Sequence, residues 1–323
     1  MLAARTVNDM RTYMGLPPLP FDDPEGNKPF GVIKEKTHDD VYLDVMRKIL
    51  REGDITPDRT GTGTVSLFGT RMEFDLKKGF PLLTTRKIFF MGVVDELLWF
   101  ISGSTNAYDL PKRTQKWWTP WASEKGNLGP TYGYLLRNLG GKMPTLKDDT
   151  IKSDDYRPDV GVDQLKEVIN ELKNSPESRR HVISLWNREY MPYQGLPTCH
   201  GSVIQFHVSP EENGKRTLSC QVYQRSADFC IGVPANIASY ALLTHIIAQI
   251  TGYEVGKLIW VGGDTHIYLN HLDGAQEQLS RSPLPSPTIR INEELKDIDE
   301  LQESDITLLD YNFLEPIKFE VSV

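Results

Sequence analysis

The stretch from residue 203 to residue 261 constrains the fold most strongly, because strand and helix patterns alternate there. Two runs have the apolar character of strands, Val203–Val208 and Thr217–Tyr223. Residues 236–251 are mostly apolar and helical in pattern, and Lys257–Val261 returns to a strand pattern. Since helices and strands are interleaved, we expect an α/β (α+β) fold.

The rest of the chain adds elements of both kinds. Apolar residues at helical spacing predict helices at Asp39–Glu52 and Val162–Leu172, and Phe89–Ile101 has the composition of a buried helix. Strands are predicted at Val65–Leu76 and His181–Trp186. These segments would supply the layers that cover the strands of the first stretch.

The domain organisation is simple. No internal repeat or linker divides residues 39–323, so we expect one catalytic domain over residues 38–323. Residues 1–37 contain proline-rich, turn-forming segments and are expected to be an N-terminal extension that could be flexible. A length of 323 residues with 39% hydrophobic and 25% charged residues fits a globular protein.

Charge and cysteine content narrow the partners and the compartment. A net charge of −8 argues against direct nucleic-acid binding, although a small anion needs only a few arginines. Three cysteines without framework spacing indicate a reducing compartment, and no Cys/His spacing suggests a metal. We see no secretory signal and no apolar run of membrane-spanning length. We therefore expect a cytoplasmic protein, or one in the cytoplasm of an infected host.

The chemistry-bearing side chains gather around Cys199. This cysteine precedes a strand pattern, and within about forty residues there follow Arg225, Asp228 and Asn236. They supply a nucleophile, an anion-binding group, a carboxylate and an amide that can read a base edge. A thiol reacts as the thiolate, which clustered arginines favour.

Two upstream features stay open between a structural and a functional interpretation. The run Asp58–Thr64 could cradle phosphate through its backbone N–H groups and Arg59, but we favour a plain surface turn. Glu96 interrupts an apolar helix, so it either lies on a solvated edge or serves as an acid or base.

Three other features have two interpretations each. Adjacent Arg179 and Arg180 are usually a solvated edge, but two guanidiniums also suit a phosphate dianion. His266 and Tyr268 alternate on a strand and so share a face, and no carboxylate stands at metal-ligand spacing. Three tryptophans lie close together in the sequence, and they either belong to the core or line a site for a flat heteroaromatic ligand. They are Trp117, Trp118 and Trp121.

Long motifs occur in a fixed order along the chain. They are Asp58–Thr64, Gly79–Thr85, Glu96–Phe100, Ser178–Arg180, Tyr223–Ser226, Asn236–Tyr240 and Gly263–Tyr268. With these motifs in this order, the chain resembles the thymidylate synthase superfamily from about residue 39 to its C-terminus.

The resemblance implies roles for individual residues. Cys199 would add to carbon 6 of a pyrimidine nucleotide, so that carbon 5 attacks the methylene of the co-substrate 5,10-methylenetetrahydrofolate. Catalytic roles are implied for Cys199, Glu96, Tyr132, Asp228 and Arg225. Nucleotide contacts are implied for Arg59, Arg179, Arg180, His200, Gln224, Arg225, Ser226, Asn236, His266 and Tyr268. Folate contacts are implied for Trp118, Asp228, Ile231, Gly232, Ala235 and Val321.

The resemblance also implies the assembly. The family fold is a single domain around a bent mixed β-sheet, and two sheets face each other in a homodimer. Arg179 and Arg180 would reach the phosphate of the partner subunit, and the C-terminal tail would close over the site. The amide of Asn236 can both donate and accept, which matches uracil, whereas an aspartate would suit cytosine. We therefore expect dUMP and not dCMP as substrate.

The chain departs from the family pattern at several positions. These departures are Asp95 for histidine, Leu135-Leu136 for Gln-Trp, Thr198 for proline, Ala235 for phenylalanine and Phe313-Leu314-Glu315 for Pro-His-Pro. Replacing phenylalanine by Ala235 removes enough volume to admit a water. We therefore favour a deoxyuridylate hydroxymethylase, which hydrates the transferred methylene to make 5-hydroxymethyl-dUMP for modified viral DNA. The alternatives are a divergent thymidylate synthase, which reduces the methylene to give dTMP, and a catalytically silent relative.

Overall fold

The computed structural model describes residues 36–58, 60–143 and 158–321. The helices are α2 (His38–Glu52), α3 (Phe90–Ile101), α4 (Lys112–Gln115), α5 (Tyr132–Arg137), α6 (Gln164–Asn174), α7 (Gly232–Thr251) and α8 (Leu272–Ser280). The strands are β1 (Asp54–Thr56), β2 (Thr64–Asp75), β3 (Val182–Ile183), β4 (Val203–Val208), β5 (Thr217–Asp228), β6 (Glu254–Tyr268), β7 (Thr288–Ile291) and β8 (Ile306–Leu309). The extension predicted over residues 1–37 lies almost wholly outside the described residues.

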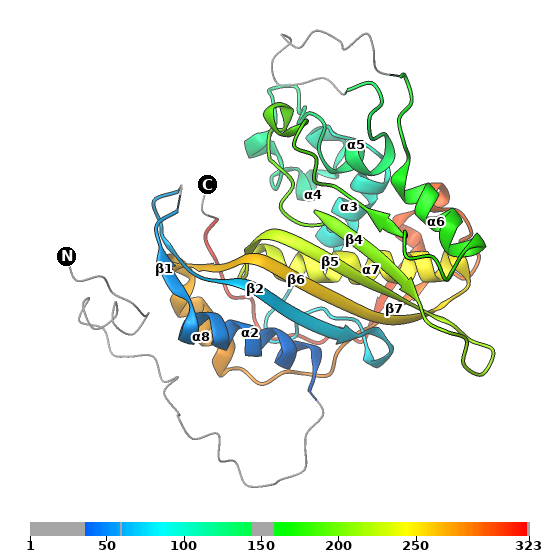
Figure 1. Ribbon diagram of the computed structural model, residues 1–323. Helices are drawn as coiled ribbons and strands as arrows, with labels where there is room; N and C mark the ends of the chain where they lie inside the picture. Colours follow the sequence, from blue (N-terminus) through cyan, green and yellow to red (C-terminus); the bar gives the residue numbers. More distant parts are fainter. Residues whose placement is uncertain (1–35, 59, 144–157, 322–323) are drawn as a thin grey trace, which may run out of the picture.

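A six-stranded mixed sheet forms the centre of the molecule, in the order β1-β2-β6-β5-β4-β3. The β5–β6 pair is parallel and the other pairs are antiparallel. The parallel pair needs a crossover, which α7 provides between the two strands (Figure 1). The predicted mixed α/β architecture is confirmed, and a separate hairpin pairs β7 with β8.

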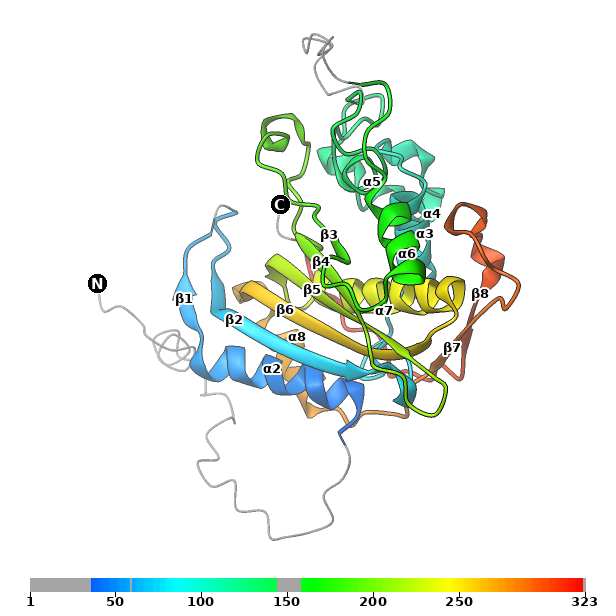
Figure 2. The same cartoon turned by 45° about the vertical axis from the view of Figure 1, so that its right-hand side comes forward.

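The sheet has one buried and one open face. Along β4, Ile204, Phe206 and Val208 are buried, while Val203 and His207 are exposed. In both views α7 lies behind β4, β5 and β6, on the side where α3 and α6 also pack (Figures 1 and 2). The core therefore lies between the helices and one face of the sheet.

Helix α7 is longer than the sequence pattern predicts, because it begins at Gly232. Its 20 residues make it long and apolar enough to cross a membrane by length and composition alone, so the expectation that no segment reaches that length is wrong. In this structure 83% of an apolar 18-residue stretch of the helix is buried, as in the core helix of a globular protein.

The strand predicted at His181–Trp186 is much shorter than expected. Only Val182 and Ile183 pair with β4. Beyond them the side chain of Gln164 takes the place of a strand partner, since its amide donates to Ser184 O at 2.9 Å and its Oε1 accepts from Ser184 N at 3.0 Å. Conversely, β5 and β6 exceed their predicted lengths because they pair with each other as far as Asp228 and His266.

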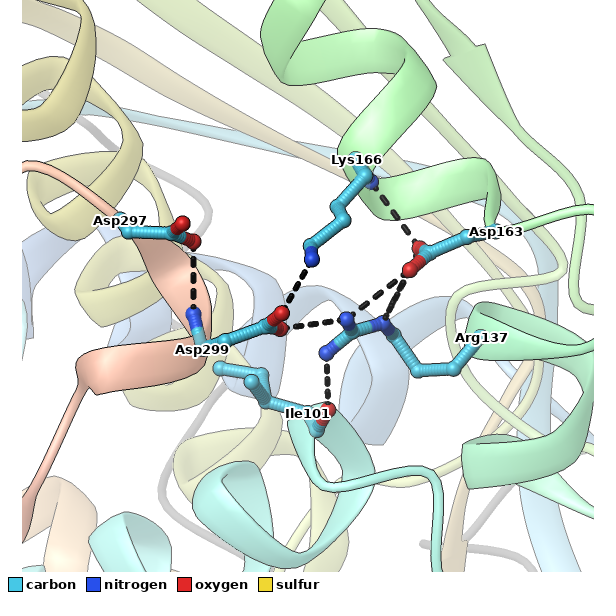
Figure 3. A network of polar contacts seen from close by, with 6 residues as sticks. All are labelled: Ile101, Arg137, Asp163, Lys166, Asp297 and Asp299. Atoms are coloured by element: carbon cyan, nitrogen blue, oxygen red, sulfur yellow. Dashed lines mark hydrogen bonds and ion pairs between the residues drawn. The ribbon is translucent and has the colours of Figure 1, made fainter.

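A polar cluster around Arg137 joins the helical layer (Figure 3). The guanidinium of Arg137 donates to both oxygens of Asp163 at 2.9–3.0 Å and to Asp299 at 2.6 Å. It also donates to the carbonyl of Ile101 at the end of α3. The Arg137 side chain is only 14% exposed, and Asp163 caps α6 by accepting from Lys166 N. The cluster thus fixes α3, α5 and α6 relative to one another and to the segment around Asp299.

Candidate active site

Cys199 lies in the loop before β4, and a tyrosine holds its backbone. The N–H groups of Cys199 and His200 point to the phenol oxygen of Tyr132, at 2.9 and 3.4 Å. Tyr132 begins α5 and is 1% exposed, and burial raises the pKa of its phenol well above the ordinary value. The phenol therefore stays protonated, accepts from the backbone of Cys199 and His200 and keeps its own O–H for donation.

Arg225 on β5 faces the sulfur of Cys199. Its backbone N–H donates to Cys199 O at 2.8 Å, and its Nε donates to Thr198 O at 3.2 Å. One Nη atom lies 3.7 Å from the sulfur, and the guanidinium stacks over Trp186 at 5.0 Å. No carboxylate among the described residues pairs with Arg225, so its charge is available to the thiolate and to an anionic ligand.

His200 is held as a neutral imidazole. Burial lowers its pKa to about 3. The ring stacks on Tyr132 at 4.6 Å, and its Nδ1 shares a hydrogen bond of 2.8 Å with the hydroxyl of Tyr240. A neutral ring in contact with both tyrosines can orient groups around Cys199 but adds no positive charge to the site.

Glu96 on α3 has the polar partner that a carboxylate in an apolar helix requires. Trp118 donates its indole N–H to Glu96 at 2.7 Å. Burial raises the pKa of Glu96 to about 7, against the lowering effect of the Trp118 hydrogen bond. A carboxyl group that exchanges its proton near neutral pH suits a general acid or base.

The tryptophan cluster is mainly core. Trp118 is 5% exposed, whereas Trp117 and Trp121 are half-buried. Rings lie around Trp118 with centroids 5.1–6.4 Å away: Trp99, Phe100, Trp121 and Tyr132. Its indole N–H donates to Glu96, so Trp118 fits the core interpretation with one polar contact added.

A chain of amide hydrogen bonds fixes the side chain of Asn236. The indole N–H of Trp260 donates to Gln224 Oε1 at 2.9 Å. The amide nitrogen of Gln224 then donates to Asn236 Oδ1 at 3.0 Å and to Ser226 O at 3.2 Å. Because an indole can only donate, the orientation of both amides follows from the position of Trp260. Asn236 thus keeps its N–H groups and part of its oxygen for a ligand.

Strand pairing brings the other predicted nucleotide residues together. In the β5–β6 register, Ser226 lies opposite Asp264 and Asp228 lies opposite His266. His266 Nδ1 is 2.9 Å from Asp264 Oδ1, and the rings of His266 and Tyr268 are 5.2 Å apart. The shared face predicted for His266 and Tyr268 is confirmed.

Asp228 ends β5 at the start of the turn into α7. One of its oxygens accepts from the backbone N–H groups of Cys230 and Ile231 at 3.1 and 3.0 Å. Its other oxygen accepts no hydrogen bond from the described residues. Gly232 and Ala235 follow in the first turn of α7 and are half-buried. This corner therefore offers an acceptor for N–H groups beside a small, partly open surface.

The run Asp58–Thr64 uses its amides internally. The carboxylate of Asp58 accepts from Thr60 N at 2.9 Å and from Gly63 N at 2.8 Å. This arrangement fits the plain turn that we favoured, and Gly63 O accepts from Leu269 N at 3.0 Å, next to Tyr268. Arg59 itself lies outside the described residues.

Arg179 and Arg180 form no side-chain hydrogen bond or ion pair with the described residues around Cys199. Both are exposed, on the segment before β3, and neither guanidinium pairs with any residue that the structure describes. Val321, near the C-terminus, is 63% exposed. The tail before it is attached by Leu314 N to Thr84 O at 2.8 Å and by His271 Nε2 to Glu320 O at 2.6 Å.

The departures from the family pattern fall in different environments. Thr198 is 1% exposed, and its hydroxyl has no hydrogen-bond partner among the described residues. Ala235 is half-buried, whereas Leu135 and Leu136 belong to the core. Asp95 is buried and forms an ion pair with Arg113.

Several residues of the site were assigned no role from the sequence. Trp186, Tyr240 and Trp260 contact Arg225, His200 and Gln224 respectively from other elements. Each lies in an apolar pattern typical of core, so only the tertiary structure identifies it. Within the described ranges, no group of three His, Cys, Asp or Glu side chains could hold a metal ion.

Comparison with known families gives the identity of this arrangement. The model of the thymidylate synthase family matches residues 40–323. The match covers most of the chain and all of the site residues described above, so the protein belongs to the thymidylate synthase family.

Proposed function

We propose that this member of the thymidylate synthase family is a deoxyuridylate hydroxymethylase. The family catalyses folate-dependent one-carbon transfer to dUMP, with methylenetetrahydrofolate as co-substrate. Our proposal concerns the last step, in which water adds to the transferred methylene and 5-hydroxymethyl-dUMP is formed. In the reductive alternative the tetrahydrofolate supplies a hydride, and dTMP is formed.

Cys199 and Arg225 begin the reaction in this proposal. The thiolate forms a bond to carbon 6 of the uracil ring, and the electron pair of the 5,6 double bond makes carbon 5 nucleophilic. Carbon 5 takes up the one-carbon unit, loses its proton and, when the folate leaves, carries an exocyclic methylene. The oxygen of a water then bonds to this methylene while the water gives up one proton to a base. The electron pair returns through carbon 5, the 5,6 double bond re-forms, and the sulfur leaves carbon 6 as thiolate. Arg225, 3.7 Å from the sulfur, stabilises the thiolate at both ends of the sequence.

The orientation of Asn236 supports selection of one base. Uracil presents an N–H beside an oxygen, and cytosine presents the reverse polarity, so a freely rotating amide could pair with either. Here Trp260 fixes Gln224, and Gln224 fixes Asn236. A locked amide discriminates between the two bases, and the family's substrate identifies uracil as the preferred one.

Asp228 and its surroundings fit the pterin of a folate. A pterin carries N–H donors on a flat ring, and Asp228 has one oxygen without a protein donor. Ile231, Gly232 and Ala235 follow Asp228 along the chain and are half-buried, so they offer partly open surface beside that oxygen. The bound folate supplies the one-carbon unit, while these residues hold and orient it.

The buried hydroxyl of Thr198 is the observation that carries the hydroxymethylase proposal. It immediately precedes the nucleophile and finds no partner among the described residues. A buried hydroxyl without a protein partner is the kind of group that a buried water satisfies, which supports the proposal. Proline at this position would offer no such group, and phenylalanine at position 235 would fill space that Ala235 leaves.

One observation favours the reductive alternative. Leu135 and Leu136, which replace Gln-Trp, are 0% and 4% exposed and pack in the core. Their substitution therefore reflects repacking and gives no route for water. A divergent thymidylate synthase is the second candidate for this reason.

Product analysis separates the two candidates. The protein is incubated with dUMP and methylenetetrahydrofolate, and nucleotide and folate products are identified. We expect 5-hydroxymethyl-dUMP with tetrahydrofolate; dTMP with dihydrofolate would show the reductive reaction instead. Release of tritium from carbon 5 of dUMP is measured in parallel, since a silent relative would release none. The variants Thr198→Pro and Ala235→Phe should shift the product toward dTMP.

We also propose a homodimer formed through the open face of the sheet. Large apolar side chains are exposed there, including Phe68 at 88% and Val203 at 43%. Arg179 and Arg180 have no partner among the described residues, which fits donation to a second subunit. Sedimentation tests the state directly. A Cys199→Ser subunit mixed with an Arg179→Gln/Arg180→Gln subunit should recover activity that neither homodimer has, and a monomer would contradict the proposal.

A further inference from the structure

Asp95 is a buried charge one residue before Glu96 on α3. Its side chain is 2% exposed. Arg113 on α4 reaches it with two parallel bonds, Nε to Oδ2 and Nη2 to Oδ1, each 2.7 Å long. The buried hydroxyl of Thr114 adds a third contact at 3.3 Å. A bidentate pair of this kind fixes both distance and orientation.

The backbone transmits this fixed geometry from α4 to Trp118. Thr114 O accepts from Trp117 N at 2.9 Å, and Gln115 O accepts from Trp118 N at 3.0 Å. The turn that begins beside Arg113 therefore ends at the indole that donates to Glu96. Helix α3 thus holds this segment at two successive residues, through Asp95 at one end and Glu96 at the other.

We propose that Asp95 and Arg113 are positioning residues that hold the indole of Trp118 against Glu96 and so control how the reaction ends. The proposal rests on the proposed function and on the catalytic role that the family resemblance implies for Glu96. Asp95 stands where the family pattern has histidine, so the pair is a feature of this chain. The rings around Trp118 fill space without fixing the direction of its N–H, whereas the ion pair fixes the backbone that carries it.

Arg113 has a second carboxylate partner, Glu303, which provides a control for the loss of charge alone. Arg113 contacts Glu303 at 2.8 Å, but Glu303 is 51% exposed. An exposed pair of this kind contributes little. Glu303→Gln therefore serves as a matched control that removes a carboxylate from Arg113 without disturbing the Asp95 contact.

The experiment compares Asp95→Asn, Arg113→Gln and Arg113→Lys with Glu303→Gln. Three quantities are measured: tritium release from carbon 5, the ratio of the two nucleotide products, and the pH midpoint of turnover. We expect Asp95→Asn and Arg113→Gln to change the product ratio several-fold. The Trp118 hydrogen bond opposes protonation of Glu96, so its loosening should move the midpoint upward by about one pH unit, the equivalent of one hydrogen bond to a charged group.

Each outcome bears on the proposal. Arg113→Lys keeps the charge but loses the bidentate contact, so it should change the product ratio and the pH midpoint in the same direction by a smaller amount. If Asp95→Asn does not fold, Arg113→Lys tests the proposal in its place. Unchanged product ratio and midpoint in variants that merely unfold more easily would overturn the positioning role. A change of equal size in Glu303→Gln would overturn it as well. If the parent protein makes only dTMP, the proposed last step fails, yet the midpoint still tests Asp95 and Arg113.

Discussion

Two arginines in this molecule have opposite surroundings. Arg137 donates to Asp163, Asp299 and a helix-terminal carbonyl, so each of its three guanidinium nitrogens has an acceptor. Arg225 meets a carbonyl, a tryptophan face and a sulfur, and it has no carboxylate partner among the described residues. A saturated guanidinium stabilises the fold, whereas an unsaturated one keeps its charge for a ligand or a nucleophile.

Arg179 and Arg180 extend the comparison to the surface. They are exposed and pair with none of the described residues, although the chain has more acidic than basic residues. In a protein with a net charge of −8, an arginine without a carboxylate partner indicates a binding role more strongly than a paired arginine does. This distinction makes separate predictions for activity and for stability.

Replacing Arg225 or Arg137 by glutamine should give the largest effects, one on turnover and the other on stability. Arg225→Gln removes the cation beside the sulfur, so we expect turnover to fall by on the order of 1,000-fold with little change in the free energy of unfolding. Arg137→Gln leaves Asp163 without its cation, so it should lower the free energy of unfolding by about 2–4 kcal/mol while turnover at saturating substrate stays near that of the parent. Steady-state kinetics and urea denaturation measure the two quantities.

The comparison fails if the effects are reversed or shared. A strongly destabilised Arg225→Gln would mean that this guanidinium is structural despite its free charge. A catalytic defect in a folded Arg137→Gln would mean that the cluster in Figure 3 acts on the site.

The locked amide should give the next largest effect. Asn236→Asp replaces the N–H donor by an acceptor, which fits the exocyclic amine of cytosine. We expect the ratio of kcat/KM for dUMP over dCMP to fall by at least about 100-fold. Gln224→Glu is the companion variant, since it removes the donor that orients Asn236. Parallel assays with both nucleotides decide the matter, and an unchanged preference in both variants would contradict the role of the amide chain.

The sequence predicts much of the fold but few of the tertiary contacts that hold the site residues in place. Helix α2 and strand β4 lie where their apolar patterns predict them, because local periodicity reports which face is buried. Strand β3 is shorter than predicted, since Gln164 competes for the backbone of Ser184. Such a competition depends on residues twenty positions apart and leaves no local pattern.

The same limit applies to the site. Cys199 and Asn236 are chemically conspicuous in the sequence and occur in recognisable motifs. Trp260 and Tyr240 look like ordinary core residues, yet one orients the amides and the other binds His200. Their function lies in one polar atom on an apolar ring, and periodicity does not register that atom.

Glu96 gives a prediction with a smaller, pH-dependent effect. Its pKa is about 7 in the folded protein against 4.5 ordinarily, so the folded state binds this proton more tightly than the unfolded state. The contribution to stability is complete below the ordinary pKa and is lost as the pH rises through about 7. Glu96→Gln should therefore flatten the fall in stability over this interval and also abolish the corresponding step in the pH profile of turnover.

Thermal unfolding at a series of pH values measures the first effect. Glu303→Gln, at an exposed carboxylate, should leave the pH dependence as in the parent protein. Identical slopes in Glu96→Gln and the parent would show that another group titrates there.

The smallest effect distinguishes the two carboxylates that saturate Arg137. Asp163 is 27% exposed and makes three of the bonds, whereas Asp299 is 42% exposed and makes one. We expect Asp163→Asn to lower the free energy of unfolding by about 2 kcal/mol, since asparagine can still cap α6 with its oxygen but loses the charge and one acceptor for Arg137. Asp299→Asn should cost less than about 1 kcal/mol, because solvent screens an exposed pair. Urea denaturation at low and at high salt tests the ranking. An equal cost for both variants would mean that the number of partners, and not their burial, determines how strongly a saturated arginine stabilises this fold.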